Sequence, residues 1–510
     1  MSFKDFLINL KDKRFPMDFP GHFIDSQWVK AGKSPVLKET NNPSQGEKIF
    51  DVRLDKAHLD QAITSTISGA ERFANLKIEK RIEFLDRFTK AFGDYAPQIQ
   101  QCLQINGGKP RWEAECEVSA ALKLLRHTCS SWREIEASFL ANFNFNQQVH
   151  KVYLKAAGPT LALLPFTTPV TTFAQYFVAS ILSGSPLLMV CSGNAGLTGV
   201  CLSYLVEALE LPPGSFNMVF GNFTTYKQVS LDKRFQCLLY LGSREHCDQL
   251  RKENLSVSKR QVVLQSGGKN ALLVHSSADL DKAIKWGVQG AIRSGGQLCT
   301  STSRIFVYKN LLDKFVEGFK AAMEEVRIGP TDGDSGNPDM GPLYSKKAID
   351  KFLRFQTMAL REKGKTVLRG QDFNTGTNGY FVRPGVHLME AFDASKAYQS
   401  NVLMCPDVAI YEYEVLETAI DQINTTDAPF VVSFAGDPAI VASHAHMFLA
   451  PNVIVNQPTS ALELTMPIAG KRQCGHHRFN GAGLSFLLTY PQAVIDSAAF
   501  YNEAWPSSKI

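Results

Sequence analysis

The chain has 510 residues, of which 44% are hydrophobic and 20% are charged, so it is too long and too apolar to be a disulfide-stabilised miniprotein or a disordered tail. Its 54 Lys and Arg against 49 Asp and Glu give a formal net charge of +5, which is small for this length, and without basic runs it argues against nucleic-acid binding. At about 150 residues per domain, the length predicts two to four lobes with sizeable cores.

The amino-terminal segment and the cysteines indicate the compartment. Residues 1–15 carry charged side chains along their length and lack the unbroken apolar stretch of a secretory signal. The ten cysteines stand singly, with no CxxC pair and no metal-ligand spacing. We therefore expect reduced thiols, no metal site and a cytoplasmic protein.

Apolar positions recur at helical spacing over residues 54–139, which predicts helices that cover another layer. From residue 160 onward, short apolar runs alternate with helix-length segments, as in parallel βα units whose strands are buried on both faces. The predicted strands are Leu161–Leu164, Pro186–Val190, Phe216–Phe220 and Gln236–Leu241. The predicted helices are Val170–Leu182, Leu197–Leu209 and Thr224–Leu231.

An uncharged run extends from Ala156 to Val206 within this region. A membrane span would need about twenty predominantly apolar residues, whereas this run is interrupted by prolines and glycines such as Pro165, Pro169 and Gly184. We therefore expect the buried centre of a wound sheet and no membrane partner.

A second βα series is predicted to begin at Val262, and two such lobes would leave a cleft between them. Its expected elements are the strands Ala271–His275 and Arg304–Tyr308 and the helices Leu280–Arg293 and Leu311–Arg327. The alternating pattern from Asn142 to Lys155 predicts a hairpin, for which Leu484–Ile495 is the candidate partner strand.

The glycine-rich segment GGQLCT at residues 295–300 is the densest signal for chemistry. It follows a predicted helix and precedes a predicted strand, so Cys299 would lie on a loop that a substrate can approach. Cys299 is therefore the candidate nucleophile, with a buried structural thiol as the alternative interpretation. A second glycine turn, QSGGKN at residues 265–270, opens the second lobe.

The chain resembles the aldehyde dehydrogenase superfamily over nearly its full length. The resemblance rests on the order and spacing of GGQLCT at 295–300, SGGKN at 266–270, Asn42-Pro43, LPPG at 211–214, MGP at 340–342 and Tyr490-Pro491. Within the superfamily, GGKPRWEA at 107–114, EV at 117–118 and CGHHR at 474–478 look most like succinylglutamate semialdehyde dehydrogenase.

This resemblance implies an α/β fold with two wound parallel-sheet lobes and a β-hairpin oligomerisation element. Residues 1–141 and 158–265 would form a Rossmann-like dinucleotide-binding domain, and residues 266–480 a catalytic domain. Residues 142–157 and 481–510 would supply the oligomerisation hairpin and a C-terminal strand. A homodimer or homotetramer is therefore expected.

The resemblance also implies that a thiolate attacks a small-molecule aldehyde, a hydride passes to NAD or NADP, and the resulting thioester is hydrolysed. The sequence departs from the family at two positions of this machinery. The general-base Glu is replaced by Gln265, whose amide cannot take a proton, and the Asn that donates to the oxyanion is replaced by Thr167.

The positions implied in dinucleotide binding have changed more. Those that match are Gly242, Ser243, Ser192, Gly221 and Gly267. The Lys and Glu that hold the adenosine ribose in the family fall on Val190 and Gly193, and the acid for the second ribose falls on Val402. Turn residues without a ligand are the alternative interpretation of the glycines and serines.

His476 and His477, near the expected substrate mouth, are either an anchor for an anionic substrate or solvated surface groups. Arg111 either binds a carboxylate or has a packing or ion-pair role on a cover helix. Three functions remain open. The first is oxidation of an aldehyde, such as a carboxylate-bearing semialdehyde, with NAD or NADP. The second is an acyl-transferring or reductive variant that uses coenzyme A or an acyl phosphate. The third is a pseudoenzyme with an oligomerisation or binding role and a dinucleotide pocket filled by apolar side chains.

Overall fold

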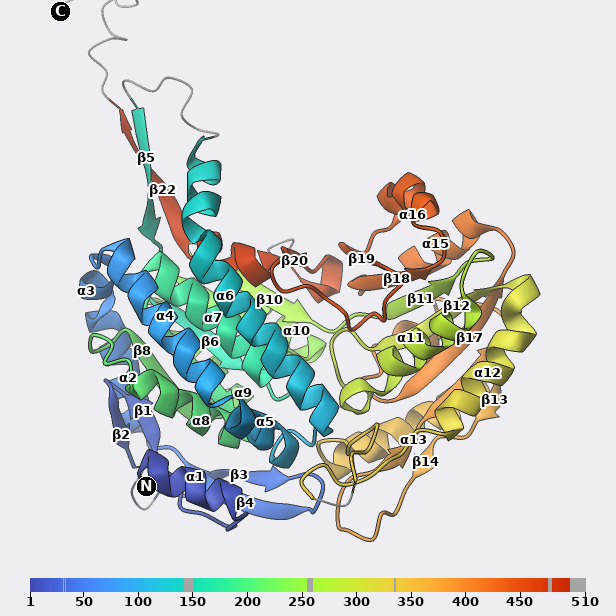
Figure 1. Cartoon of the computed structure of the whole chain (residues 1–510), viewed down its shortest axis with the longest axis horizontal. Coiled ribbons are helices and arrows are strands. Elements are labelled where there is room, and N and C mark those ends of the chain that lie inside the picture. Colours follow the sequence, from blue (N-terminus) through green and yellow to red (C-terminus); the bar gives the residue numbers. More distant parts are fainter. Residues whose placement is uncertain are drawn as a thin grey trace, which may run out of the picture.

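The computed structural model describes residues 1–30, 32, 34–141, 150–254, 260–333, 336–475 and 479–495. Two lobes, each built on a seven-stranded sheet, lie side by side, and a two-stranded ribbon projects from the first lobe (Figure 1). The predicted α/β architecture with two wound sheets is confirmed.

The first lobe contains a sheet with the strand order β10-β9-β6-β7-β8-β1-β2. Its parallel strands are β6 (Thr160–Leu164), β7 (Leu187–Ser192), β8 (Phe216–Gly221), β9 (Cys237–Gly242) and β10 (Gln261–Ser266), and it is extended antiparallel by β1 (His22–Ile24) and β2 (Gln27–Val29). The strand near Val262 was expected to begin the second lobe. That expectation was wrong, because β10 pairs with β9 and completes the first sheet.

The uncharged run forms β6, α7 (Pro169–Ser183), β7 and α8 (Gly196–Glu207) at the centre of this lobe. Every residue of β6 is buried, as are almost all residues of the two helices, so a charge here would lie in an apolar core. Among the described residues, no helix is long and apolar enough to cross a membrane. Burial inside the sheet therefore accounts for the absence of charges.

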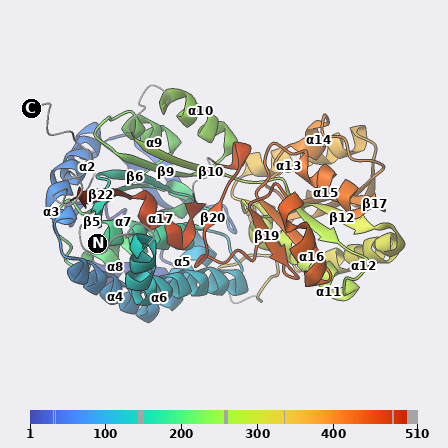
Figure 2. The ribbon, with the colours of Figure 1, turned by 90° about the horizontal axis from the view of Figure 1, so that it is seen from above.

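Helices cover both faces of the first sheet (Figure 2). One face carries α7 and α8 beneath α4 (Ile78–Asp94), α5 (Ala96–Ile105) and α6 (Arg111–Ala141). The other carries α2 (Lys56–Ser68), α9 (Phe223–Ser230) and α10 (Arg244–Asn254). The remaining elements are α1 (Phe3–Lys11), α3 (Ala70–Ala74) and the hairpin of β3 (Val36–Asn42) and β4 (Glu47–Arg53).

The second lobe has a sheet with the order β13-β16-β17-β12-β11-β18-β19, in which only the β13 pairing is antiparallel. Its strands are β11 (Asn270–Val274), β12 (Thr302–Tyr308), β13 (Gly364–Leu368), β16 (Gly385–Met389), β17 (Asp407–Tyr413), β18 (Val431–Ala435) and β19 (Asn452–Val455). The helices are α11 (Leu280–Ile292), α12 (Leu312–Glu324), α13 (Lys346–Arg361), α14 (Ala397–Ser400), α15 (Leu416–Asn424) and α16 (Pro438–His444). Two short pairs join β14 (Gln371–Asp372) to β15 (Val382–Arg383) and β20 (Ile468–Ala469) to β21 (Phe479–Asn480).

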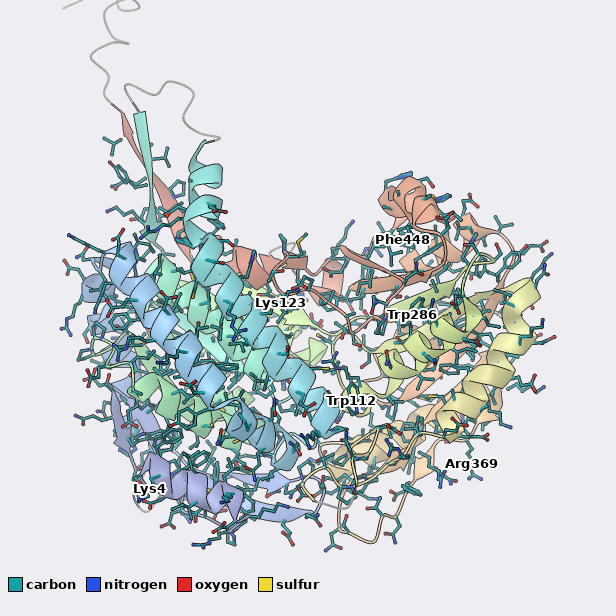
Figure 3. All side chains as sticks on the ribbon, viewed as in Figure 1. Lys4, Trp112, Lys123, Trp286, Arg369 and Phe448 are labelled. Atoms are coloured by element: carbon teal, nitrogen blue, oxygen red, sulfur yellow. The ribbon has the colours of Figure 1, made fainter. Side chains whose placement is uncertain are left out.

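Polar contacts join the lobes. Trp112 of α6 lies where the two lobes meet (Figure 3), and its indole Nε1 donates to the backbone oxygen of Asp339 at 3.2 Å. Ser44 Oγ lies 3.0 Å from Thr331 Oγ1. A site between the lobes therefore has fixed walls on both sides.

The projecting ribbon pairs β5 (His150–Ala156) antiparallel with β22 (Thr489–Ile495). This confirms the predicted pairing with the C-terminal segment. The start of the predicted strand is wrong, because Leu484–Leu487 forms the short helix α17, in which Leu484 is buried in the first core. Residues 142–149, which the hairpin prediction includes, and residues 496–510 lie outside the described part of the chain.

Candidate active site

Three left-handed residues present Cys299 at the junction of the lobes. After α11 ends at Ile292, Ser294, Gly295 and Gly296 have φ values of 51°, 60° and 68°. A Cβ at Gly296 would lie 2.4 Å from the carbonyl group of Cys405, so no larger residue fits there. The strained turn at Ser294 is held by Glu113, whose carboxylate accepts the Ser294 backbone N–H at 2.8 Å.

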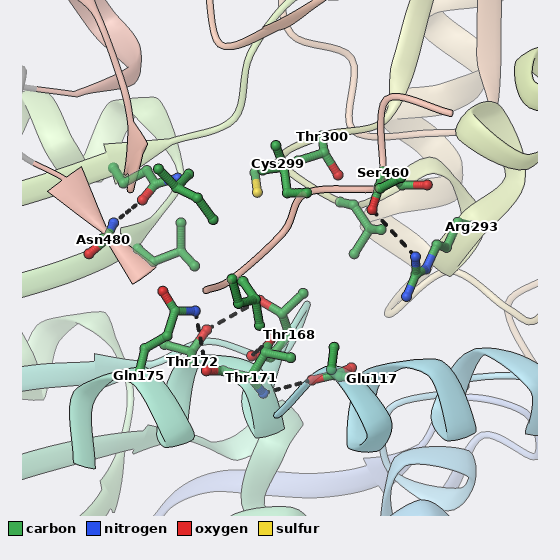
Figure 4. Close-up of a pocket in the computed structure, with 18 of the residues that line it drawn as sticks. Glu117, Thr168, Thr171, Thr172, Gln175, Arg293, Cys299, Thr300, Ser460 and Asn480 are labelled. Atoms are coloured by element: carbon green, nitrogen blue, oxygen red, sulfur yellow. Dashed lines mark hydrogen bonds between the residues drawn. The ribbon is translucent and has the colours of Figure 1, made fainter. Parts of the chain in front are cut away.

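A cavity of about 270 Å³ lies in front of this loop, between the lobes (Figure 4). Its wall includes Cys299, apolar side chains such as Tyr176, Leu241 and Phe430, and a polar set from both lobes. The polar set includes Thr168, Thr171, Thr172, Gln175, Arg293 and Ser460. The cavity combines an apolar body with convergent polar groups, as small-molecule sites do.

The surroundings of Cys299, which is partly buried at the cavity wall, favour its protonated thiol. Burial beside the apolar cluster of Phe430 and Ile468 raises its pKa to about 12, and the contact of the thiol with its own backbone N–H opposes this only weakly. The backbone of Cys299 is fixed, because its carbonyl accepts from Gly268 N at 3.0 Å and from Asn270 Nδ2 at 2.9 Å. The nucleophile candidate is thus well positioned but poorly ionised.

Gln265 lies near the end of β10 and is 7% exposed. Its side-chain oxygen accepts a hydrogen bond from Asn480 Nδ2 on β21, and both residues line the cavity. The Asn480 side-chain oxygen is buried and has no hydrogen-bond partner among the described residues. Neither amide can remove a proton, so this pair supplies hydrogen bonds and no base.

Thr167 precedes the cavity wall. Its carbonyl accepts Lys109 Nζ at 2.7 Å, and it is not among the residues that line the cavity. Thr168 and Thr172, whose hydroxyls lie 3.2 Å apart, do line it. The first turn of α7 therefore brings hydroxyl groups to the cavity one to five residues beyond the predicted position.

A buried ionic network supports this turn. Lys109 Nζ lies 2.5 Å from Glu117 Oε2 and 3.4 Å from Glu113 Oε1, and all three side chains are at most 3% exposed. The second oxygen of Glu117 accepts the backbone N–H of Val170 at 2.9 Å. Glu117 thus anchors the start of α7, while Glu113 anchors the turn before Cys299.

The predicted substrate residues are not brought together. Arg111 has a side chain that is 72% exposed and pairs with Glu115 at 2.8 Å, and it does not line the cavity. His476 and His477 lie outside the described residues. Arg293, which the sequence did not single out, lines the cavity instead, with Nη1 3.5 Å from the carbonyl of Ser460.

Residues predicted to bind a dinucleotide share one edge of the first sheet. Ser192, Gly221 and Gly242 end β7, β8 and β9, and Ser243 follows, with its hydroxyl accepting the N–H of His246 at 3.3 Å. Gly267 adjoins Cys299: a Cβ there would lie 3.5 Å from the Cys299 Cα. Among the described residues no group of three potential ligands could hold a metal ion.

A model of the aldehyde dehydrogenase family matches residues 28–492. The chain belongs to this family. One relative is the hydroxyisobutyraldehyde dehydrogenase of Mycolicibacterium austroafricanum, which is 24% identical over 91% of this chain and 90% of that protein. Another is the N-succinylglutamate 5-semialdehyde dehydrogenase of Burkholderia cenocepacia, which is 24% identical over 93% of this chain and 96% of that protein. The fold is also that of a Mycobacterium tuberculosis aldehyde dehydrogenase solved with NAD+, with a TM-score of 0.85, 18% identity and coverage of 94% and 98%.

Three polar residues that the sequence did not single out line the cavity: Arg293, Ser460 and Asn480. Arg293 stands six positions before Cys299, and this proximity was the one available signal. Ser460 and Asn480 come from segments far along the chain, so no local pattern connects them to Cys299. The family membership identifies an oxidoreductase superfamily, and the chain's own side chains determine what it does.

Proposed function

We propose that this member of the aldehyde dehydrogenase family binds a small carboxylate-bearing aldehyde in the cavity and adds Cys299 to its carbonyl carbon. The observation that carries the proposal is that Cys299 and Arg293 line one cavity of about 270 Å³. A thiol and a fixed cation at one cavity suit a molecule with an aldehyde at one end and a carboxylate at the other.

Arg293 is the proposed anchor for the carboxylate. Its side chain is 21% exposed, and its Nε is buried without a hydrogen-bond partner among the described residues. Glu113 Oε1 lies 3.9 Å from Nε, but that carboxylate already accepts hydrogen bonds from Ser294. A guanidinium binds a carboxylate through parallel charged hydrogen bonds, so the Arg293 side chain at the cavity wall favours this ligand.

The proposed chemical step is an addition. The Cys299 sulfur forms a bond to the carbonyl carbon, the C=O π bond becomes a C–O single bond, and the thiol proton ends on that oxygen, which gives a thiohemiacetal. The developing negative charge would be met by the Cys299 backbone N–H and by a hydroxyl of the segment that includes Thr167 and Thr168.

The side chains limit the later steps of the family reaction. At pH 7 a thiol with a pKa of about 12 is ionised in about one molecule in 10⁵, so addition is slow. Gln265 cannot activate water, and a missing general base lowers a rate by about 10²–10⁴. NAD or NADP accepts the hydride in the family, but no step proposed for this chain uses one, because the side chains at the dinucleotide edge do not fit it.

Thermal melting with matched aldehydes tests the proposal. Succinic semialdehyde should raise the melting temperature saturably, and butanal, which has the same chain length without the carboxylate, should have a much smaller effect. Arg293→Gln should abolish the difference, whereas Arg111→Gln, at an exposed arginine outside the cavity, should preserve it. Equal stabilisation of the wild type by both aldehydes would show that no carboxylate is recognised.

A second comparison addresses the oxyanion. Thr167→Ala and Thr168→Ala each remove one hydroxyl from the same turn. If one of the two hydroxyls donates a hydrogen bond to the oxyanion, the variant without that hydroxyl should form the Cys299 adduct about 10²-fold more slowly. Intact-protein mass spectrometry follows the formation of the adduct. If neither variant slows adduct formation, the hydroxyls of this turn have no part in the addition.

A further inference from the structure

The carboxyl ends of the parallel strands in the first lobe are where a wound sheet of this kind binds a nucleotide. Two helices begin at this edge on the same face: α9 after β8 and α10 after β9. They lie next to each other over the sheet (Figure 2). The space between their first turns is the position we consider for the flat base of a dinucleotide.

That space is filled by two stacked rings. The rings of Phe223, the first residue of α9, and His246, in the first turn of α10, have centroids 3.6 Å apart and planes within 6°. Two surfaces that hold a base between them must lie about 7 Å apart, because each contact takes about 3.5 Å. The stack leaves no layer for a base.

Contacts with two tyrosines also hold the stack in place. Tyr240 of β9 has its hydroxyl 2.9 Å from His246 Nδ1, and its ring meets Phe223 edge-on at 5.7 Å. Tyr226 of α9 packs on Tyr240 at 5.2 Å and is fully buried. Opening the slot would therefore break a hydrogen bond and disturb an aromatic cluster that belongs to the core of the lobe.

The positions that the family resemblance implies in ribose binding have lost their charged side chains, at this edge and beside the Cys299 loop. Val190 is fully buried in the apolar cluster of this face. Gly193 is covered by Lys38 of β3, and a Cβ on Gly193 would lie 2.5 Å from the Lys38 Cγ. Beside the Cys299 loop, Met404 and Val402 lie against Gly267, with 3.2 Å and 3.4 Å from its hypothetical Cβ to Met404 Sδ and Val402 Cγ1. Val190, Val402 and Met404 offer hydrocarbon or thioether where a ribose hydroxyl needs a hydrogen bond, and Lys38 turns its aliphatic stem to Gly193.

We infer that this edge is closed to NAD and NADP by the Phe223–His246 stack, so that an aldehyde held by Cys299 is released unchanged by the reverse reaction instead of being oxidised. The closed edge belongs to the first lobe and does not depend on the proposed function of Cys299. The fate of the aldehyde rests on the proposed function. The chain would then hold and release an aldehyde, with no change in the oxidation state of carbon.

Titration of the full-length protein with NADH and NADPH, followed by nucleotide fluorescence, tests the closure. The wild type should show no saturable binding up to about 1 mM, a concentration at which even a weak site fills. The double variant Phe223→Ala, His246→Ala frees the ring of Tyr240 to stack on a base, which should tighten binding by at least about tenfold. Saturable binding to the wild type overturns the inference, and so does a double variant that binds no better than the wild type.

Phe3→Ala is the matched control. Phe3 lies on α1 and stacks on Tyr204, so the substitution removes a ring of the same lobe that is remote from the nucleotide edge. Circular dichroism establishes that each variant is folded before titration. The control should bind no nucleotide, and nucleotide binding to it would show that the Phe223–His246 stack is not the barrier.

Aldehyde capture is measured separately, as protection of Cys299 from iodoacetamide by succinic semialdehyde without nucleotide. Nucleotide binding to the wild type together with normal protection would refute the closure and leave the proposed function standing. No nucleotide binding together with no protection would do the reverse. The two conclusions therefore fail in distinguishable ways.

Discussion

The reactivity of Cys299 gives the most direct test of the candidate site. Burial raises its pKa to about 12, whereas an exposed thiol has a pKa near 8.5. At pH 7 the folded protein therefore holds roughly 3,000-fold less thiolate at this position than an unfolded chain. The more basic thiolate is roughly 40-fold more nucleophilic, so the net slowing is roughly 80-fold.

The assay is iodoacetamide labelling of the Cys299 peptide, quantified by mass spectrometry between pH 7 and pH 10. For the folded protein the rate should rise about tenfold per pH unit across the whole range, because the thiol stays below its pKa. The same peptide in the denatured chain is the matched control, and its rate should level off near pH 9. Folded-state labelling that levels off below pH 9, or exceeds the denatured rate at pH 7, would refute the view that burial keeps this thiol protonated.

Three further outcomes follow from the described contacts. Glu117→Gln leaves Lys109 paired with Glu113 alone and weakens the charged hydrogen bonds that Glu117 makes to Lys109 and to the Val170 N–H, so it should lower the free energy of unfolding by about 1–3 kcal/mol in urea. Glu115→Gln, on the exposed face, should change it by less than about 0.5 kcal/mol. Burial lowers the pKa of His22 to about 4 from 6.5, so the folded state keeps this imidazole neutral. The free energy of unfolding should therefore fall as the pH drops from 6.5 towards 4, and it should be lower by about 2 kcal/mol at pH 5 than at neutral pH. A His22→Gln variant whose free energy of unfolding fell by the same amount over this range would contradict the assignment to His22. Gel filtration should show an oligomer, for which the exposed β5–β22 ribbon is the candidate contact, and elution near 56.5 kDa would refute it.

The sequence predicted the features that depend on local burial. A strand buried on both faces must be apolar throughout, and for that reason β6 to β9 could be located within a few residues. The uncharged run pointed to the centre of the first sheet for the same reason. The glycines before Cys299 likewise marked a turn, because left-handed backbone favours glycine. These features depend only on the composition of short, continuous segments.

The tertiary structure decided which distant parts of the chain these segments contact. The β10 strand has the same composition whichever sheet it joins. The residue pattern placed it in the second lobe and the family resemblance placed residues up to 265 in the first, and its pairing with β9 decided for the first lobe. The place of Arg293 and Cys299 on one cavity wall, the hydrogen bond from Asn480 to Gln265 and the stacking of Phe223 on His246 each depend on chain crossings and helix positions. The amino-acid sequence by itself determined a wound α/β protein with a cysteine on a glycine turn. The ionisation of that cysteine and the access of a nucleotide to it depend on side chains that are distant in sequence and pack around the site. The reason is that burial and contact are properties of the folded arrangement.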